Sequence, residues 1–110
     1  MENWTDHGEM SRIVALQVAL ELEDIESGEW VVVTDSLGSG VIHKGDFNQL
    51  SVEVWGSTLQ VMNMRNEKPV FSIDSKSSVS LLKKENAIQV VVTKDGKSIT
   101  HILSKKNKHR

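Results

Sequence analysis

The chain of 110 residues contains no cysteine, which excludes disulfide bonds, thiolate nucleophiles and zinc–thiolate sites. It also lacks a long apolar run. The best candidate, residues 13–22, is interrupted by Gln17 and Glu21 and is shorter than the roughly 18 residues that span a bilayer. The N-terminus is acidic where a secretory signal would be basic. These absences predict a cytoplasmic protein without a transmembrane segment.

Catalytic motifs are scarce as well. The four histidines, His7, His43, His101 and His109, do not have the His-x-His or His-x₃-His spacing of a metal site. No serine lies in a Gly-x-Ser-x-Gly motif, and Gly38-Ser39-Gly40 lacks the lysine of a phosphate-binding loop. His101 shares a strand face with apolar neighbours, which favours a structural role. We therefore expect no enzymatic activity, no cofactor and no metal.

An alternation of apolar residues is the main pattern that is present. It is clear in Leu50, Val52 and Val54 and recurs up to Leu103, and each run ends at a turn signal. A period of two places such side chains on one face of a strand. The sequence therefore predicts a mainly β fold, a small antiparallel β-barrel or sandwich of about seven strands. The residues that show the alternation are Leu50, Val52, Val54, Leu59, Val61, Phe71, Ile73, Val79, Leu81, Ile88, Val90, Val92, Ile99, His101 and Leu103.

Two signals place the turns. Asp95-Gly96 lies between two alternating runs and predicts a type I′ hairpin with Val92 and Ile99 near the turn. The only proline, Pro69, is expected to open a strand, where its missing N–H is tolerated. Residues 1–10 are interpreted as a flexible leader, residues 11–104 as a single β-rich domain and residues 105–110 as a disordered basic tail.

The segment from Ser11 to Gly28 fits two structures. As a helix, it has a stripe from Val14 to Ile25, with Ser11 as the cap and Ser27-Gly28 as the end. As a strand, it alternates without interruption from Val14 to Leu22. Its content of Ala, Leu and Glu favours one N-terminal helix, and an extra strand remains the alternative.

Charge is distributed asymmetrically. Residues 1–29 contain eight acids and only Arg12 as a base, whereas residues 76–110 contain nine bases and two acids. The two segments either attract each other in the fold or leave the basic end for an anionic partner. The candidate polyanion-binding residues are Lys83, Lys84, Lys94, Lys97, Lys105, Lys106, Lys108 and Arg110.

A second candidate surface is apolar. Trp55 is out of phase with the alternating residues of its strand, and Met62 and Met64 point away from Leu59 and Val61. This face is expected either to receive the N-terminal helix or to bind a protein partner. Trp30, Phe47 and Phe71 are expected to be packing residues.

Residues 40–103 resemble the strand plan of pleckstrin-homology-like (PH-like) domains. The resemblance begins with the segment 40–47, continues through a Lys-Pro turn at 68–69 and ends with the Asp95-Gly96 hairpin. It implies a small β-barrel. Two features differ from the family: the sequence after Ser104 has no apolar stripe for a closing helix, and Lys44 stands alone where lipid-binding members have a basic cluster.

These patterns favour a non-catalytic interaction module that binds a protein or peptide partner, which the sequence does not identify. One alternative is polyanion binding, to nucleic acid or an anionic membrane surface, through the basic C-terminal third. Another is a structural subunit that self-assembles through an edge strand, with Lys83, Lys84 and Pro69 as candidates for blocking unwanted pairing. The pattern does not indicate an oligomeric state.

Overall fold

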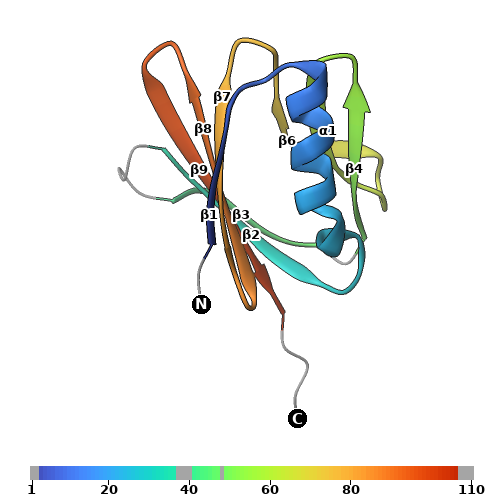
Figure 1. The fold of residues 1–110 in the computed structure, drawn as a ribbon. Coiled ribbons are helices and arrows are strands. Elements are labelled where there is room, and N and C mark those ends of the chain that lie inside the picture. The colour runs from blue at the N-terminus through green and yellow to red at the C-terminus, as the bar shows by residue number, and fades with distance from the viewer. Residues whose placement is uncertain (1–2, 37–40, 48, 107–110) are drawn as a thin grey trace.

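The chain folds into two layers in the computed structural model, which describes residues 3–36, 41–47 and 49–106. One layer is a six-stranded sheet, and the other consists of a three-stranded sheet and helix α1 (Figure 1). All strand pairs are antiparallel. The predicted mainly β class is confirmed, with nine strands in the described residues where about seven were expected.

The six-stranded sheet contains both early and late strands of the chain. Its order in space is β1 (Asn3–Glu9), β7 (Ser78–Lys84), β8 (Ala87–Lys94), β9 (Lys97–Lys105), β2 (Trp30–Ser36) and β3 (Val41–Phe47). The smaller sheet has the order β4 (Leu50–Trp55), β5 (Thr58–Asn63) and β6 (Lys68–Ile73). The two sheets are separate hydrogen-bonded units, so the architecture is a sandwich and not a closed barrel.

The ambiguous N-terminal segment is a helix. Helix α1 (Arg12–Glu21) begins where the Ser11 side chain accepts a hydrogen bond from the backbone N–H of Val14, 3.2 Å away. After Leu22 the chain continues as a short 3₁₀ helix, η1 (Glu23–Glu26), and turns at Gly28, whose φ is +86°. The N-cap therefore lies where the sequence predicts it, and the helix ends earlier than Ser27.

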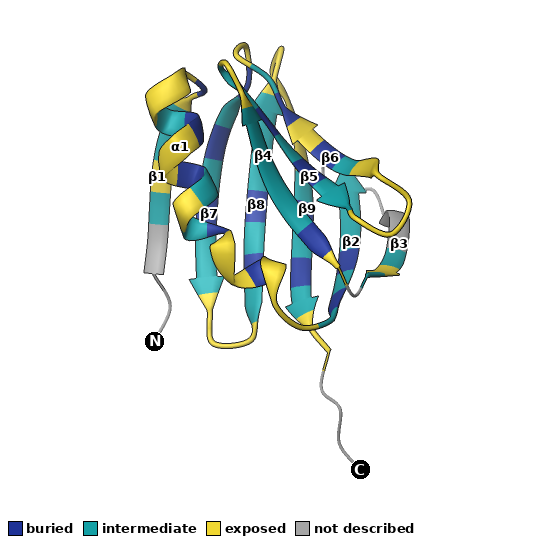
Figure 2. Cartoon of the chain, turned by 90° about the vertical axis from the view of Figure 1, so that its right-hand side faces the viewer, coloured by how far each residue is buried: buried dark blue, intermediate teal, exposed yellow. Residues whose placement is uncertain are grey.

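A single apolar core lies between the layers. Val18 of α1 and Leu22, the residue directly after α1, are buried in it together with Val32, Val61 and Leu103 from both sheets. Of the alternating residues in the sequence, all but Ile99 are buried or packed against this core, as the dark blue positions of Figure 2 illustrate, and Ile99 near the hairpin turn is 37% exposed. Trp30 and Phe71 are also buried, which confirms both as packing residues.

Two boundaries of the chain differ from the expectation. Residues 3–9, which were expected to belong to a flexible leader, form β1 and pair with β7 at the edge of the large sheet. Their lack of a clear period reflects this edge position, because a bulge near Gly8 shifts the register. The expected tail starts too early, since Lys105 is the last residue of β9. The rest of that tail, from residue 107, lies outside the described residues.

The hairpin and proline predictions are confirmed. Asp95 and Gly96 both have positive φ angles, +56° and +77°, and Val92 pairs with Ile99. Pro69 lies in β6, an edge strand of the small sheet. Lys83 and Lys84 do not block an edge, because β7 lies between β1 and β8.

None of the helices among the described residues is long and apolar enough to cross a membrane.

Candidate interaction surface

Helix α1 has apolar side chains on both of its sides. Ala15, Val18 and Leu22 face the core and have no exposed surface. On the opposite side, Ile13 and Leu20 are each 69% exposed and Leu16 is 46% exposed. Positions i, i+3 and i+7 lie on one face of a helix, so these side chains form one row, which we call the α1 stripe. Figure 2 shows the exposed positions along the outward side of α1.

The α1 stripe is unusual for a helix on a protein surface. Such helices normally carry polar side chains opposite their apolar face, and isolated exposed leucines require no explanation. Three large aliphatic side chains in one row are different, because burying one such side chain completely is worth about 1.5–3 kcal/mol. The fold thus leaves this apolar row in water although the helix has another apolar side in the core.

The outward face of the small sheet lies in the same layer as α1. Trp55 is 67% exposed and donates a hydrogen bond from Nε1 to Glu53 Oε1, 3.0 Å away. Met62 is half-buried, and the exposed Met64 lies with its sulfur 3.0 Å from Ser51 Oγ. The structure therefore places the predicted partner-binding residues Trp55, Met62 and Met64 on the outward side of the small sheet, where Trp55 and Met64 are exposed and Met62 is half-buried.

The expectation that the N-terminal helix covers Met62 and Met64 is wrong. Helix α1 instead lies beside β4 within the second layer and contacts β1, β4 and β5 through its core side. The reason is that Ala15, Val18 and Leu22 complete the core over the part of the large sheet that the three-stranded sheet does not reach (Figure 2). The outward faces of α1 and of β4–β5 are both left exposed.

Acidic residues border the α1 stripe at the C-terminal end of the helix. Glu23 and Asp24 are exposed, and within the part of the chain that the structure describes they form no ion pair. Glu21 lies 3.6 Å from Lys83, and Glu26 accepts a hydrogen bond from the backbone N–H of Val52. Acids at this end oppose the helix dipole by about 0.3–1 kcal/mol each, so helix stability does not explain their presence.

The candidate polyanion-binding lysines do not form one surface. Lys83, Lys84, Lys105 and Lys106 lie at one end of the large sheet, because the backbone N–H of Lys105 bonds to Asn86 O in the turn between β7 and β8. Lys94 and Lys97 lie at the opposite end of β8, about 25 Å away for a strand of this length. Lys108 and Arg110 lie outside the described residues.

Several of these lysines already have partners. Lys83 pairs with Glu21, Lys94 lies 2.6 Å from Asp74 Oδ2, and Lys106 lies 3.2 Å from Asp46 Oδ2. The hydrogen bond between Lys94 and Asp74 lowers the pKa of Asp74 and raises the pKa of Lys94. The Lys83–Glu21 pair joins the basic C-terminal third to the acidic N-terminal third, so part of the charge asymmetry is satisfied within the fold.

A cavity of about 460 Å³ lies between β6 and the β8–β9 hairpin. His101 lies in its wall, stacked on Phe71 with ring centroids 4.0 Å apart, and His101 Nδ1 is 3.0 Å from Thr34 Oγ1. Burial lowers the pKa of His101 to about 4, so the ring is neutral at pH 7. These contacts confirm the structural role expected of His101. The lining residues are Ser72, Asp74, Ser77, Val92, Lys94, Asp95, Lys97, Ile99 and His101.

The charges at the rim of this cavity balance. Lys94 and Asp74 pair with each other, and Lys97 and Asp95 add one charge of each sign. The rim therefore has no excess charge that would select an ionic ligand.

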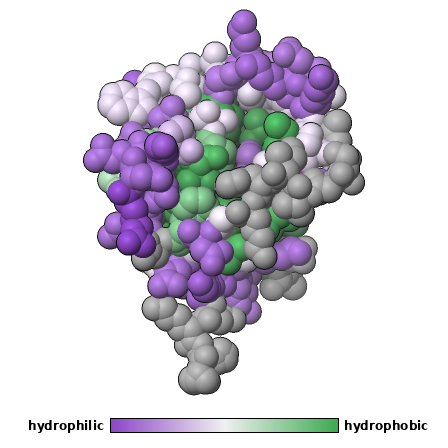
Figure 3. Space-filling view, turned by 180° about the vertical axis from the view of Figure 1, so that it is seen from behind, coloured by the Kyte–Doolittle hydropathy of each residue, from purple (hydrophilic) through white to green (hydrophobic). Residues whose placement is uncertain are grey.

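Hydrophobic surface is visible in the middle of the molecule seen from behind, where the edge strands β3 and β6 face the viewer (Figure 3).

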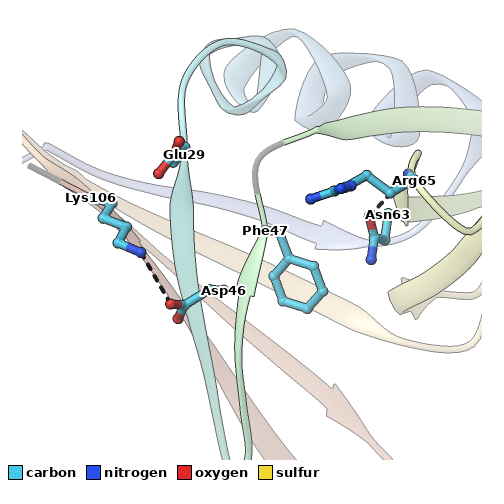
Figure 4. Close-up of a pocket in the computed structure, with 6 residues that line it drawn as sticks. All are labelled: Glu29, Asp46, Phe47, Asn63, Arg65 and Lys106. Carbon is cyan, nitrogen blue, oxygen red and sulfur yellow. Dashed lines mark hydrogen bonds and ion pairs between the residues drawn. The ribbon is translucent and has the colours of Figure 1, made fainter. Parts of the chain in front are cut away.

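A smaller polar cavity of about 170 Å³ lies near the end of β3. Figure 4 shows the ion pair of Asp46 and Lys106 on one side of the ring of Phe47. On the other side the backbone N–H of Arg65 donates a hydrogen bond to Asn63 Oδ1. Glu29 completes the lining, so two acids face two bases and the charges cancel. This arrangement does not favour an anion.

The α1 stripe was absent from the sequence prediction, although its signal was present. The core stripe that predicts the helix consists of Val14, Val18, Leu22 and Ile25. A second row of Ile13, Leu16 and Leu20 lies on the opposite side of the same helix. Under the strand interpretation, Leu16 and Leu20 belonged to the buried face. The buried row can be told from the exposed row only when the segment is known to be a helix and the side that faces the core is known.

No family model matches the chain, and no curated protein or solved structure matches it. The resemblance to PH-like domains therefore stays a prediction.

Proposed function

We propose that the protein is a non-catalytic interaction module that binds a protein partner through the outward face of its second layer. The observation that supports this function best is the α1 stripe, three large aliphatic side chains exposed in one row on a helix that already has an apolar side in the core. Exposed apolar patches of this kind mark interaction sites. Trp55, Met62 and Met64 extend the apolar character to the neighbouring strands.

The arrangement agrees with the known anatomy of binding surfaces. Interfaces are enriched in aromatic residues and methionine at their centres and have polar margins. The outward face combines Trp55 and Met62 with aliphatic residues of α1, and Glu23 and Asp24 stand at its border. The two cavities support a ligand less well, because their charged groups are paired or balanced.

The test compares three forms of the tagged full-length chain in quantitative capture from a cell extract. They are the wild type, the double variant Ile13→Gln/Leu20→Gln, and Ile99→Gln as a matched control. Ile99 is the exposed aliphatic residue of β9 and is 37% exposed. Glutamine is a good helix former, so the double variant keeps α1 folded, which circular dichroism checks.

We expect a set of captured proteins that the wild type and Ile99→Gln retain and the double variant loses. Identical sets for all three forms would overturn the proposed function.

A further inference from the structure

The backbone of α1 restricts what can lie on the α1 stripe. Within a helix the backbone N–H and C=O groups bond to each other, so α1 offers no open edge to an incoming strand. An extended segment laid across Ile13, Leu16 and Leu20 would bury its own backbone groups without partners. A second helix satisfies those groups internally. The stripe extends over about 10 Å, or two helical turns, which suits the aliphatic row of another helix.

The charges around the stripe select the chemistry of that helix. Glu23 and Asp24 lie exposed beyond one end of α1, and Glu9 is exposed just before the other end. Arg12 is the only base among residues 1–29. A second copy of the chain would place one acid-rich segment against another, because residues 1–29 of each copy contain eight acids and one base, and an anionic membrane would be repelled by the same acids. Lysine or arginine near Glu23 and Asp24 would be attracted by both carboxylates and by the negative end of the helix dipole.

We infer that the α1 stripe docks a basic amphipathic helix, whose aliphatic row packs on Ile13, Leu16 and Leu20 and whose lysines or arginines lie over Glu23 and Asp24. This inference rests on the proposed function and names the class of its partner. Glu21 and Glu26 contribute less, because Lys83 and the N–H of Val52 already engage them.

The test uses synthetic peptides as probes, in fluorescence anisotropy titrations with the full-length chain. The first peptide is about 14 residues long, or roughly four helical turns, with leucines in one row and lysines at one end. A second peptide has glutamate in place of every lysine. A third has the composition of the first in an order that breaks the row. Each is titrated at low and at high ionic strength.

The Leu/Lys peptide is expected to bind more tightly than either control peptide by about tenfold or more, and its affinity falls as salt screens the charges. Leu16→Gln weakens this binding about tenfold at both ionic strengths, because the leucine row loses an aliphatic contact. The double variant Glu23→Gln/Asp24→Asn weakens it at low salt only and reduces the difference between the Lys and Glu peptides. Ile99→Gln, as the control, leaves all affinities unchanged.

Equal binding of the Lys and Glu peptides, or an unchanged salt dependence in Glu23→Gln/Asp24→Asn, overturns the basic partner while stripe-dependent capture would still support the proposed function. Peptide binding that Leu16→Gln does not weaken overturns the inference as well. Two further measurements complete the test. Preferential binding of the wild type to phosphatidylcholine vesicles would assign the stripe to a membrane, and a dimer that Leu16→Gln dissociates would assign it to a second copy. Either result overturns the inference.

Discussion

Leu20 and Leu22 lie two residues apart, one exposed and one buried, and their truncation tests the assignment of the two sides of α1. Leu20 is 69% exposed, whereas Leu22 has no exposed surface and packs in the core. Leu22→Ala removes a fully buried side chain and leaves a cavity, which costs about 2–5 kcal/mol in the free energy of unfolding. Leu20→Ala removes contacts mainly with water, so its cost stays within about 0.5 kcal/mol.

The two variants share the same chemical change, so the difference between them isolates burial. Alanine has the highest helix propensity, and therefore neither substitution weakens α1 intrinsically. The measurement is urea unfolding followed by circular dichroism, with equal slopes against urea required for the comparison. A second series at several protein concentrations shows whether association contributes to stability.

A loss at Leu20 that equals the loss at Leu22 would refute the assignment, because it would mean that Leu20 is buried in solution. If that loss also depended on protein concentration, the stripe would be covered by another copy of the chain. A small effect at Leu20 leaves the side chain available to a partner, as the proposed function requires.

Three further predictions concern the stability of the fold. Because burial lowers the pKa of His101 from 6.5 to about 4, protonation of this ring opposes folding, and the contribution of His101 to the free energy of unfolding falls by roughly 3 kcal/mol between about pH 7.5 and pH 4. Urea unfolding of His101→Gln across this range should lack that loss, and an equal pH dependence in both proteins would contradict the cause. Ser11→Ala removes the hydrogen bond to the Val14 N–H and should cost about 1 kcal/mol, with Ser11→Asp as the variant that restores the cap. Gly96→Ala should cost about 1 kcal/mol in the free energy of unfolding, measured by thermal or urea unfolding, because φ is +77°. Outside the adjoining residues no atom lies within 4 Å of the added Cβ, so the expected cost is conformational and not steric. An unchanged stability would contradict this cost.

The local structure of this protein could be predicted from its sequence because each signal involves neighbouring residues. Alternation in Leu50, Val52 and Val54 predicts both a strand and its inward face, and the structure confirms both. Asp95-Gly96 predicts the hairpin because these residue types tolerate positive φ. The shared phase of His101 with Ile99 and Leu103 predicts a structural role for this histidine, and its contacts confirm this role.

The pairing of distant segments was decided by the tertiary structure. Strand β1 has no clear apolar period, and it is a strand because β7 supplies a partner at the sheet edge. Residues 13–25, which fit both a helix and a strand in the sequence, are helical in the structure, because Ala15, Val18 and Leu22 cover part of the large sheet that the small sheet leaves open. The exposure of the α1 stripe was likewise decided by the tertiary structure. Composition alone does not show which of two apolar rows on a helix is buried, because the choice depends on the layer that the helix packs against.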